Sequence, residues 1–388
     1  MTNEKLINSI IFLLLFISPP IIISVISSDF LTYYYIILPI LYFLIGLWLR
    51  KYFKEKMFTK PFFFTISFLY FGIINLFFHG AFNFFNLIGP IVAFLGYCFL
   101  FKKEIDLRIF DYFLIVLYIY YYFVYFSVLP DLFYRPGFDE DAIVFDNSSS
   151  NSIPMALNIT LYSYMIMNRF YLETNNKKIL IFATINLGLV VIQQSRIGLL
   201  VSIIIFFLAV FEYSKKRSII SNVSFLNFLV ILFFVNYLAI NEFIQVLGNL
   251  NGFEALSLDI RGDAQKSFFH NMNLSRFFFG FDQKFIFAEG STGNIRYTYN
   301  VFLDMWNRYG LFQFIIFFVV LLFRIFRHSK FHFPLYFFIP FLAYSLIESI
   351  FFPNFWDCII YLLLFTPKVG FPRFIDVDIC RNDYVNLK

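Results

Sequence analysis

The stretch "ILIFATINLGLVVIQQSRIGLLVSIIIFFLAVFEY", residues 179–213, is apolar except for a polar group near its centre. As one α-helix, its 35 residues would be about 52 Å long, whereas the hydrocarbon core of a bilayer is about 30 Å thick. Two membrane-spanning helices joined by a turn at residues 193–196 fit that thickness. We therefore expect Arg196 to lie at or just inside the outer membrane surface, because an arginine at the bilayer centre costs several kcal/mol.

The composition points to the same class of protein. Hydrophobic residues make up 60% of the chain and charged residues only 14%, against about 25% charged residues in soluble proteins. The apolar run at 6–27 is expected to be a first membrane span and not a signal peptide, because Pro19 and Pro20 interrupt it and no small-residue cleavage site follows. The three cysteines form no disulfide framework. The sequence predicts an all-α polytopic integral membrane protein.

A membrane-spanning helix needs about 20 mostly apolar residues, and cutting the chain at its polar interruptions gives about twelve such segments. The predicted spans are residues 6–27, 31–49, 61–78, 84–101, 109–130, 152–168, 179–195, 197–213, 223–241, 300–323, 333–349 and 351–367.

The distribution of basic residues predicts the orientation of these spans. Cytoplasmic loops retain Lys and Arg, and alternate segments of this chain contain 22 of its 30 basic residues. Both termini are therefore expected in the cytoplasm. The eight basic residues left for the outer side are Arg135, Arg196, Arg261, Lys266, Arg276, Lys284, Arg296 and Arg308.

Residues 1–388 are expected to form a single transmembrane domain with two substantial outer loops. The loop at 131–151 is acidic, and the loop at 242–298 carries most of the outward-facing cations. Loops longer than about 15 residues are usually functional or disordered, and the second loop has enough Phe, Leu and Ile to pack. We expect it to be an elaborated functional loop.

Outward-facing arginines form the first candidate site. A guanidinium suits two-pronged recognition of phosphate or carboxylate, so several converging arginines would bind an anionic lipid head group at the membrane surface. The alternative for each residue taken singly is that it is an ordinary loop cation, or a cation whose side chain extends to the membrane interface. The set comprises Arg196, Arg261, Arg276, Arg296 and Arg308.

The second candidate site precedes the tenth predicted span. In "YTYNVFLDMWNRYGLF", residues 297–312, polar residues recur at helical spacing. The residues expected along one helix face are Asn300, Asp304, Asn307 and Arg308. Glu348 and Asp357 lie in or beside the last two spans, and intramembrane acids are functional candidates. As a general base we rank Asp304 and Glu348 ahead of the acids near Arg261.

Several short motifs resemble those of the O-antigen polymerase and ligase superfamily, bacterial membrane enzymes that build polysaccharides on undecaprenyl pyrophosphate. They are "SRIGLL" after a span, "DIRGD" in a long outer loop, a later "FFFGF", and "YNVFLDMWNRYGLF" leading into a span, in that order. The resemblance covers roughly residues 180–325. It implies a membrane glycosyltransferase architecture of the GT-C type, an active face on the extracytoplasmic side of the bacterial inner membrane, and no cofactor.

The resemblance implies roles for individual residues. Arg196 with Gly198 matches the "SR.G" motif, Arg261 matches the loop arginine, and Gly280 is a structural position. Asn300, Leu303 and Gly310 match "HN..L......G". Together with the reasoning above, the expected catalytic residues are Arg196, Arg261, Asp304 and Glu348. The expected substrate-binding residues are Arg135, Gln194, Ser195, Arg296, Tyr299, Asn300 and Arg308.

The chain departs from the superfamily pattern at Tyr299, where many members, and ligases especially, have histidine. A tyrosine has a pKa of about 10 and is a poor general base at neutral pH, which counts against a ligase mechanism. The resemblance thus favours polymerisation of undecaprenyl-pyrophosphate-linked oligosaccharide units into O antigen, capsule or exopolysaccharide. It also implies a chain-length regulator and a flippase of the same pathway as partners.

Three alternatives stay open. The first is a ligase that transfers finished glycan to an acceptor, the second is a flippase that transports lipid-linked oligosaccharide, and the third is a structural or signalling membrane protein without catalysis. Flippases of that kind usually have short loops and two similar halves, whereas only one half of this chain has a long outer loop. No phosphate-binding glycine loop and no His/Cys cluster with metal spacing is present, so we expect neither nucleotide nor metal, and no nucleic acid partner.

Overall fold

We describe the fold from a computed structural model of the chain. The structure describes residues 3–19, 28–79, 84–134, 152–171, 176–192, 196–214, 253–282, 285–290, 293–296, 298, 300–347 and 357–367. Helices make up 86% of the described residues, which agrees with the predicted all-α class.

The helices of the N-terminal half follow the predicted spans. They are α1 (Asn3–Phe12), which continues into a π-helical turn η1 (Leu13–Ile17), then α3 (Ser28–Leu49), the turn η2 (Arg50–Tyr52), α4 (Lys56–His79), α5 (Phe84–Lys102), α6 (Arg108–Tyr134), α7 (Ser152–Phe170), α8 (Asn176–Ile192) and α9 (Arg196–Ser214).

The C-terminal half adds the large loop and the last helices. Its elements are α11 (Phe253–His270), α12 (Leu274–Phe279), the strands β1 (Ala288–Gly290) and β2 (Gly293–Ile295), α13 (Val301–Phe326), the short turns η4 (His328–Lys330) and η5 (Leu335–Phe338), α14 (Ile339–Ile347) and α15 (Asp357–Phe365).

Each predicted span overlaps one of these helices except 223–241, which lies outside the described residues. Within the described part, α4 over Lys56–Phe78 and α13 over Val301–Phe326 are long and apolar enough to cross a membrane. Residues 179–192 and 196–213 belong to the two helices α8 and α9, which pack against each other. The sequence predicts two helices here, and the turn predicted at 193–196 lies largely outside the described residues. The number of spans stays a prediction.

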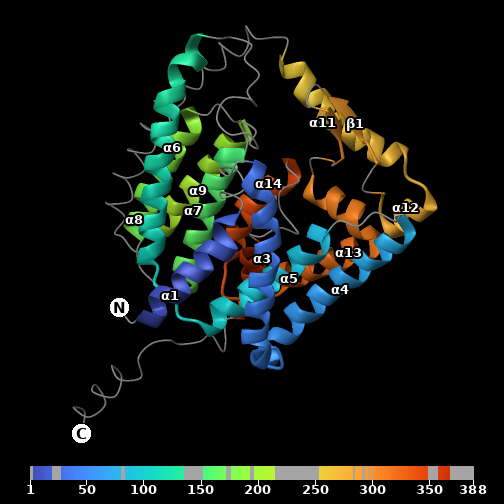
Figure 1. The fold of residues 1–388 in the computed structure, drawn as a ribbon, viewed down its shortest axis with the longest axis horizontal. Helices are drawn as coiled ribbons and strands as arrows, with labels where there is room; N and C mark the ends of the chain where they lie inside the picture. Colours follow the sequence, from blue (N-terminus) through green and yellow to red (C-terminus); the bar gives the residue numbers. More distant parts are fainter. Residues whose placement is uncertain are drawn as a thin grey trace.

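The helices form one body with a large apolar core (Figure 1). α6, α7, α8 and α9 lie together on one side, α4 and α13 lie on the other, and α5 packs against α3, α4 and α15. Outward-facing apolar side chains are common on α3, α4 and α6, for example Phe43, Phe63 and Val116. Extended apolar surface marks contact with a membrane or a protein partner, and lipid contact fits the predicted class.

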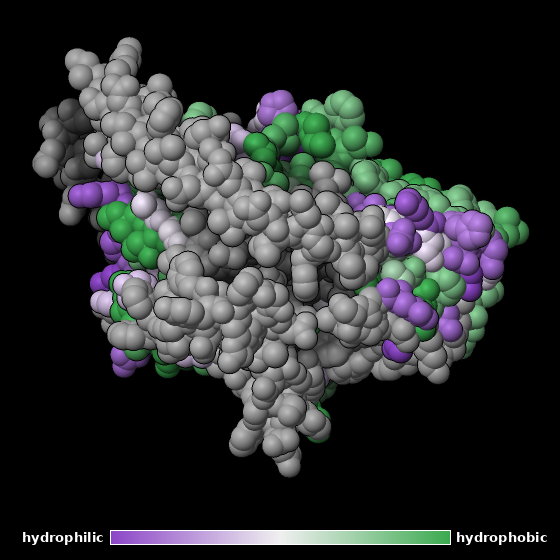
Figure 2. Space-filling model, turned by 90° about the horizontal axis from the view of Figure 1, so that it is seen from above, coloured by the Kyte–Doolittle hydropathy of each residue, from purple (hydrophilic) through white to green (hydrophobic). Residues whose placement is uncertain are grey.

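The large loop that is predicted to lie outside has a small core of its own. Ala264, Phe268, Phe281 and Phe287 are buried together, with Trp306 of α13 packed against them. β1 and β2 pair antiparallel in this region, a two-stranded element that the all-α prediction did not include. Figure 2, a view from above, shows hydrophilic surface gathered on the side of the molecule where α11, β1 and α12 lie.

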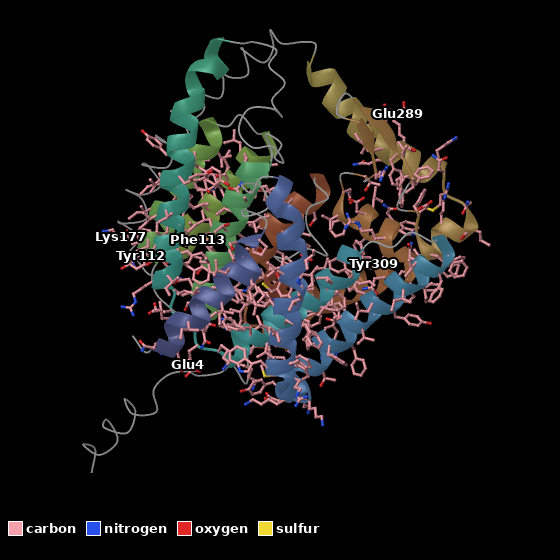
Figure 3. All side chains as sticks on the ribbon, in the orientation of Figure 1. Glu4, Tyr112, Phe113, Lys177, Glu289 and Tyr309 are labelled. Carbon is pink, nitrogen blue, oxygen red and sulfur yellow. The ribbon has the colours of Figure 1, made fainter. Side chains whose placement is uncertain are left out.

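The end of the molecule away from β1 carries ion pairs between segments that are far apart in sequence. We call it the charged end, and its paired residues are Lys5, Glu55, Lys102, Glu104, Asp111 and Lys178. Lys5 pairs with Glu104 at 2.6 Å, and Lys178 pairs with Asp111 at 2.6 Å. Figure 3 places Glu4 at this end and Glu289 of β1 at the other. The ion pairs of the charged end come from segments that the sequence predicts to be cytoplasmic.

Candidate functional site

The structure describes the side chains of only some predicted site residues. Arg196 begins α9 and Arg261 lies within α11, but the side chains of both lie outside the description. Arg296 follows β2 and is exposed. Arg135, Gln194, Ser195, Tyr299 and Glu348 lie outside the described residues. Asn300, Asp304 and Arg308 can therefore be examined directly.

Asn300 and Asp304 shape the start of α13. Asn300 is the N-cap, and its Oδ1 accepts hydrogen bonds from the backbone N–H groups of Phe302 at 3.0 Å and Leu303 at 3.2 Å. Such caps satisfy backbone donors that a helix start leaves unpaired. Asn300 therefore lies at the helix boundary, directly before Val301, and not within the helix where we expected it.

Asp304 is 1% exposed and is bonded to the segment that precedes the same helix. Its Oδ1 accepts from the backbone N–H of Thr298 at 2.8 Å and from the Thr298 hydroxyl at 2.9 Å. A carboxylate near the helix N-terminus is also favoured by the helix dipole. These contacts give Asp304 a structural role beside the predicted role as general base.

The sequence motifs "FFFGF" and "YNVFLDMWNRYGLF" meet at two glycines with positive φ. Gly280 has φ 86°, and a Cβ atom there would lie 2.2 Å from the carbonyl oxygen of Asn307. Gly310 has φ 77°, and its Cβ would lie 2.1 Å from the carbonyl oxygen of Phe278. Only glycine fits such backbone angles and such close approach. Each glycine thus admits the backbone of the other segment.

Hydrogen bonds reinforce this contact, which we call the α12–α13 junction (Gly280, Gly310 and the residues bonded across them). The N–H of Phe281 donates to the carbonyl of Asn307 at 2.8 Å, and the Trp306 indole N–H donates to the carbonyl of Phe277 at 2.8 Å. Asn75 of α4 donates to the carbonyl of Phe279. α13 is accordingly kinked at Gly310 and is not the uninterrupted helix that we predicted over 300–323.

Arg276, one of the outward-facing arginines, has a structural role in the loop. Its guanidinium carbon lies 4.6 Å from the ring centre of Phe285 and 5.1 Å from that of Phe281. Its Nη1 donates to the carbonyl of Asn271 at 2.9 Å. Stacking on two rings and bonding to the backbone engage the Arg276 guanidinium within the loop, which counts against a role for Arg276 in anion binding.

Tyr309 brings charged residues together below the junction. It is 1% exposed and interacts electrostatically with Arg308, its neighbour in α13, and with Asp357, the first residue of α15. Tyr309 lies on α13 (Figure 3), and the centre of its ring is 4.9 Å from that of Phe68 on α4. The predicted substrate-binding residue Arg308 and Asp357, an acid in or beside the last predicted span, thus both interact with the buried Tyr309.

A buried polar network near Arg196 was missed by the sequence reasoning. Asn158 of α7 donates to the carbonyl of Gly198 at 2.8 Å and to the Tyr344 hydroxyl at 2.9 Å. Asn186 of α8 donates to Asn158 Oδ1 at 2.6 Å and to Ser202 Oγ at 3.1 Å. The available signal was an asparagine inside each of two apolar spans, because polar residues in membranes are rarely without a partner or a function.

Among the described side chains, no three His, Cys, Asp or Glu residues group as a metal site. The predicted site residues of this part of the molecule are arginines and carboxylates, together with Asn300, whereas the amides of Asn158 and Asn186 are enclosed by protein.

Comparison with known proteins found no match: no family model, no curated protein and no solved structure is significantly similar to this chain.

Proposed function

We propose that this protein is a polysaccharide polymerase of the bacterial inner membrane. It joins oligosaccharide repeat units linked to undecaprenyl pyrophosphate, on the extracytoplasmic face, without metal or nucleotide. One observation carries the proposal. Segments 277–281 and 299–312, two of the motifs that resemble polymerases, are in direct contact at Gly280 and Gly310. Two degenerate motifs that meet through their glycines are better explained by a shared local structure than by chance.

The proposed reaction needs cations and a base. An acceptor hydroxyl oxygen attacks the anomeric carbon of the donor glycan, the bond from that carbon to the pyrophosphate oxygen breaks, and undecaprenyl pyrophosphate leaves. Arg196 and Arg261 stabilise the charge on the leaving group. The hydroxyl proton passes to a carboxylate, for which Asp304 and Glu348 are the candidates. Arg135, Arg296 and Arg308, with Gln194, Ser195, Tyr299 and Asn300, would bind the two glycans.

A chain-length assay tests this function. Purified protein in liposomes is supplied with lipid-linked repeat units extracted from cells that make the protein, and the products are resolved by length. We expect a ladder of multimers without added nucleotide or metal. The ladder should be lost in Arg196→Ala and in Arg196→Lys, because a point charge does not replace two-pronged binding. Lys266→Ala is the control, because Lys266 is an exposed loop cation.

Other outcomes would replace the proposal. If the wild type makes no ladder but moves the lipid-linked unit across the bilayer, the protein is a flippase. If the wild type transfers finished glycan to an added acceptor and makes no ladder, it is a ligase. A ladder that survives Arg196→Ala would remove Arg196 from the mechanism while leaving polymerisation in place.

A further inference from the structure

The buried network around Asn158 uses the whole amide of that residue. The two hydrogens on Nδ2 are donated to the Gly198 carbonyl and the Tyr344 hydroxyl, and Oδ1 accepts from Asn186. Asn158 and Asn186 are 0% exposed, Ser202 is 1% exposed and Tyr344 is 2% exposed. Among the described residues Asn186 Oδ1 has no hydrogen-bond partner, whereas all three polar positions of the Asn158 amide are bonded. In such surroundings an unpaired polar group costs about 1 to 3 kcal/mol, so the bonds of Asn158 favour one arrangement of the helices that they join.

The network fixes the first turn of α9. Gly198 is the third residue of that helix, two positions after Arg196, and its carbonyl also receives the helical bond from the backbone of Ser202. Asn158 holds this carbonyl from the side, and Asn186 holds the Ser202 side chain. Asn158 on α7 and Asn186 on α8 thus donate hydrogen bonds to the first two turns of α9, the helix that begins at Arg196.

The same amide links α9 to α14. Tyr344 lies in α14, which ends at Ile347, directly before Glu348 in the sequence. α9 and α14 also pack against each other. Asn158 bonds to both helices, so a shift of one helix end can be transmitted to the other through this amide.

We propose that Asn158 is a positioning residue for the transfer reaction, which sets the start of α9, and with it Arg196, relative to the end of α14. The proposal rests on the polymerase function proposed above. Asn158 itself is fully enclosed by protein and touches no reactant. Displacement of a binding group by about 1 Å can lower a rate constant by about 100-fold without weakening overall binding. Loss of the Asn158 amide should therefore lower kcat more than it raises KM.

Kinetics of three variants test this role. We expect Asn158→Leu, which keeps the approximate volume and removes the amide, to lower kcat roughly 10- to 100-fold with KM changed little. Tyr344→Phe removes one hydroxyl and should give a smaller loss of the same kind, which keeps the test informative if Asn158→Leu folds poorly. Thr160→Val is the control, because Thr160 is equally buried on α7 and its hydroxyl bonds only to Ala156 of its own helix.

Hydrogen exchange separates this proposal from the proposed function, because it needs no substrate. We expect faster exchange in the first turns of α9, residues 196–204, in Asn158→Leu and Tyr344→Phe, with unchanged exchange at 206–214 and in Thr160→Val. If exchange at 196–204 is unchanged, or if it rises while kcat of a polymerising enzyme stays at the wild-type value, the positioning role is refuted. Absence of polymer with wild-type protein would refute the polymerase function, whereas the exchange result would still decide whether Asn158 holds α9.

Discussion

Arg324 is a single charged residue whose surroundings in the structure differ from those predicted from the sequence. We counted it among cytoplasmic loop cations, yet it is 0% exposed. Its Nε donates to the carbonyl of Leu363 at 2.8 Å, and its guanidinium carbon lies 4.3 Å from the ring centre of Phe331. Leu363 lies in the last turn of α15, where helix carbonyls have no partner within the helix. Arg324 therefore ties the end of α13 to the end of α15.

His332, which follows η4, gives stability a pH dependence. Its Nε2 lies 3.1 Å from the carbonyl of Arg169, and burial, the largest influence, lowers the pKa of His332 from its ordinary value of about 6.5. The folded protein thus binds a proton less readily than the unfolded chain. The unprotonated His332 side chain therefore contributes fully to stability above about pH 6.5. This contribution is lost as the pH falls from there toward the pKa of His332 in the folded protein.

We expect His332→Gln to make the stability of the folded protein depend less on pH below about pH 7. Glutamine can still donate to the Arg169 carbonyl but takes up no proton. Thermal unfolding of purified protein in detergent at pH 7.5 and at pH 5.5 measures the effect. The wild type should lose more stability between the two values than His332→Gln does. His328→Gln, at an exposed histidine, should retain the wild-type difference, and an equal flattening in both variants would contradict the assignment to His332.

At the scale of elements, the α12–α13 junction shows what short motifs can and cannot predict. The resemblance marked Gly280 and Gly310 as important positions, but nothing in a linear motif says that the two glycines face each other. Their contact joins segments about 30 residues apart through backbone atoms, which carry no sequence signal. Asn158 was harder still to identify, because its partners Gly198 and Tyr344 lie 40 and 186 positions away.

Gly310→Ala should open the junction. The alanine would need a φ of 77°, which costs about 1 to 3 kcal/mol, and its Cβ would lie 2.1 Å from the Phe278 carbonyl oxygen. We expect a thermal midpoint several degrees lower, together with faster proteolysis of residues 271–290. Polymer formation should fall as well, because α12 and the loop core lose their support on α13.

Gly188→Ala is the matched control. Gly188 lies within α8, and a Cβ atom there would meet nothing within 4 Å. Alanine is favoured over glycine inside helices by about 0.5 to 1 kcal/mol, so this variant should be as stable as the wild type or slightly more stable. A thermal midpoint for Gly310→Ala equal to that of Gly188→Ala would show that the kink is not required.

For the whole molecule, hydropathy and charge predicted the helical class and the grouping of loops. The segments that hold Lys5, Glu55, Lys102 and Lys178 were all assigned to one side from their basic residues alone. In the structure, Lys102 pairs with Glu55, and the remaining segments join them through further ion pairs at the charged end. Charge alternation could predict this because it acts on every loop. It could not predict the β-hairpin or the loop core, which arise from packing particular to this chain.

Labelling from outside the cell tests the orientation of the whole molecule. Lys54 is an exposed residue of the charged end, and Leu274 is 79% exposed at the start of α12. With Cys380 replaced by serine, the other two cysteines, Cys98 and Cys358, are buried and should react little with a membrane-impermeant maleimide. We expect Leu274→Cys to be labelled in intact spheroplasts and Lys54→Cys only after permeabilisation. The reverse pattern would place the α12–α13 junction in the cytoplasm. That result would contradict the proposed function, because the proposed reaction takes place on the extracytoplasmic face. Labelling of both positions in intact spheroplasts would mean that the spans between them do not alternate as the basic residues predict.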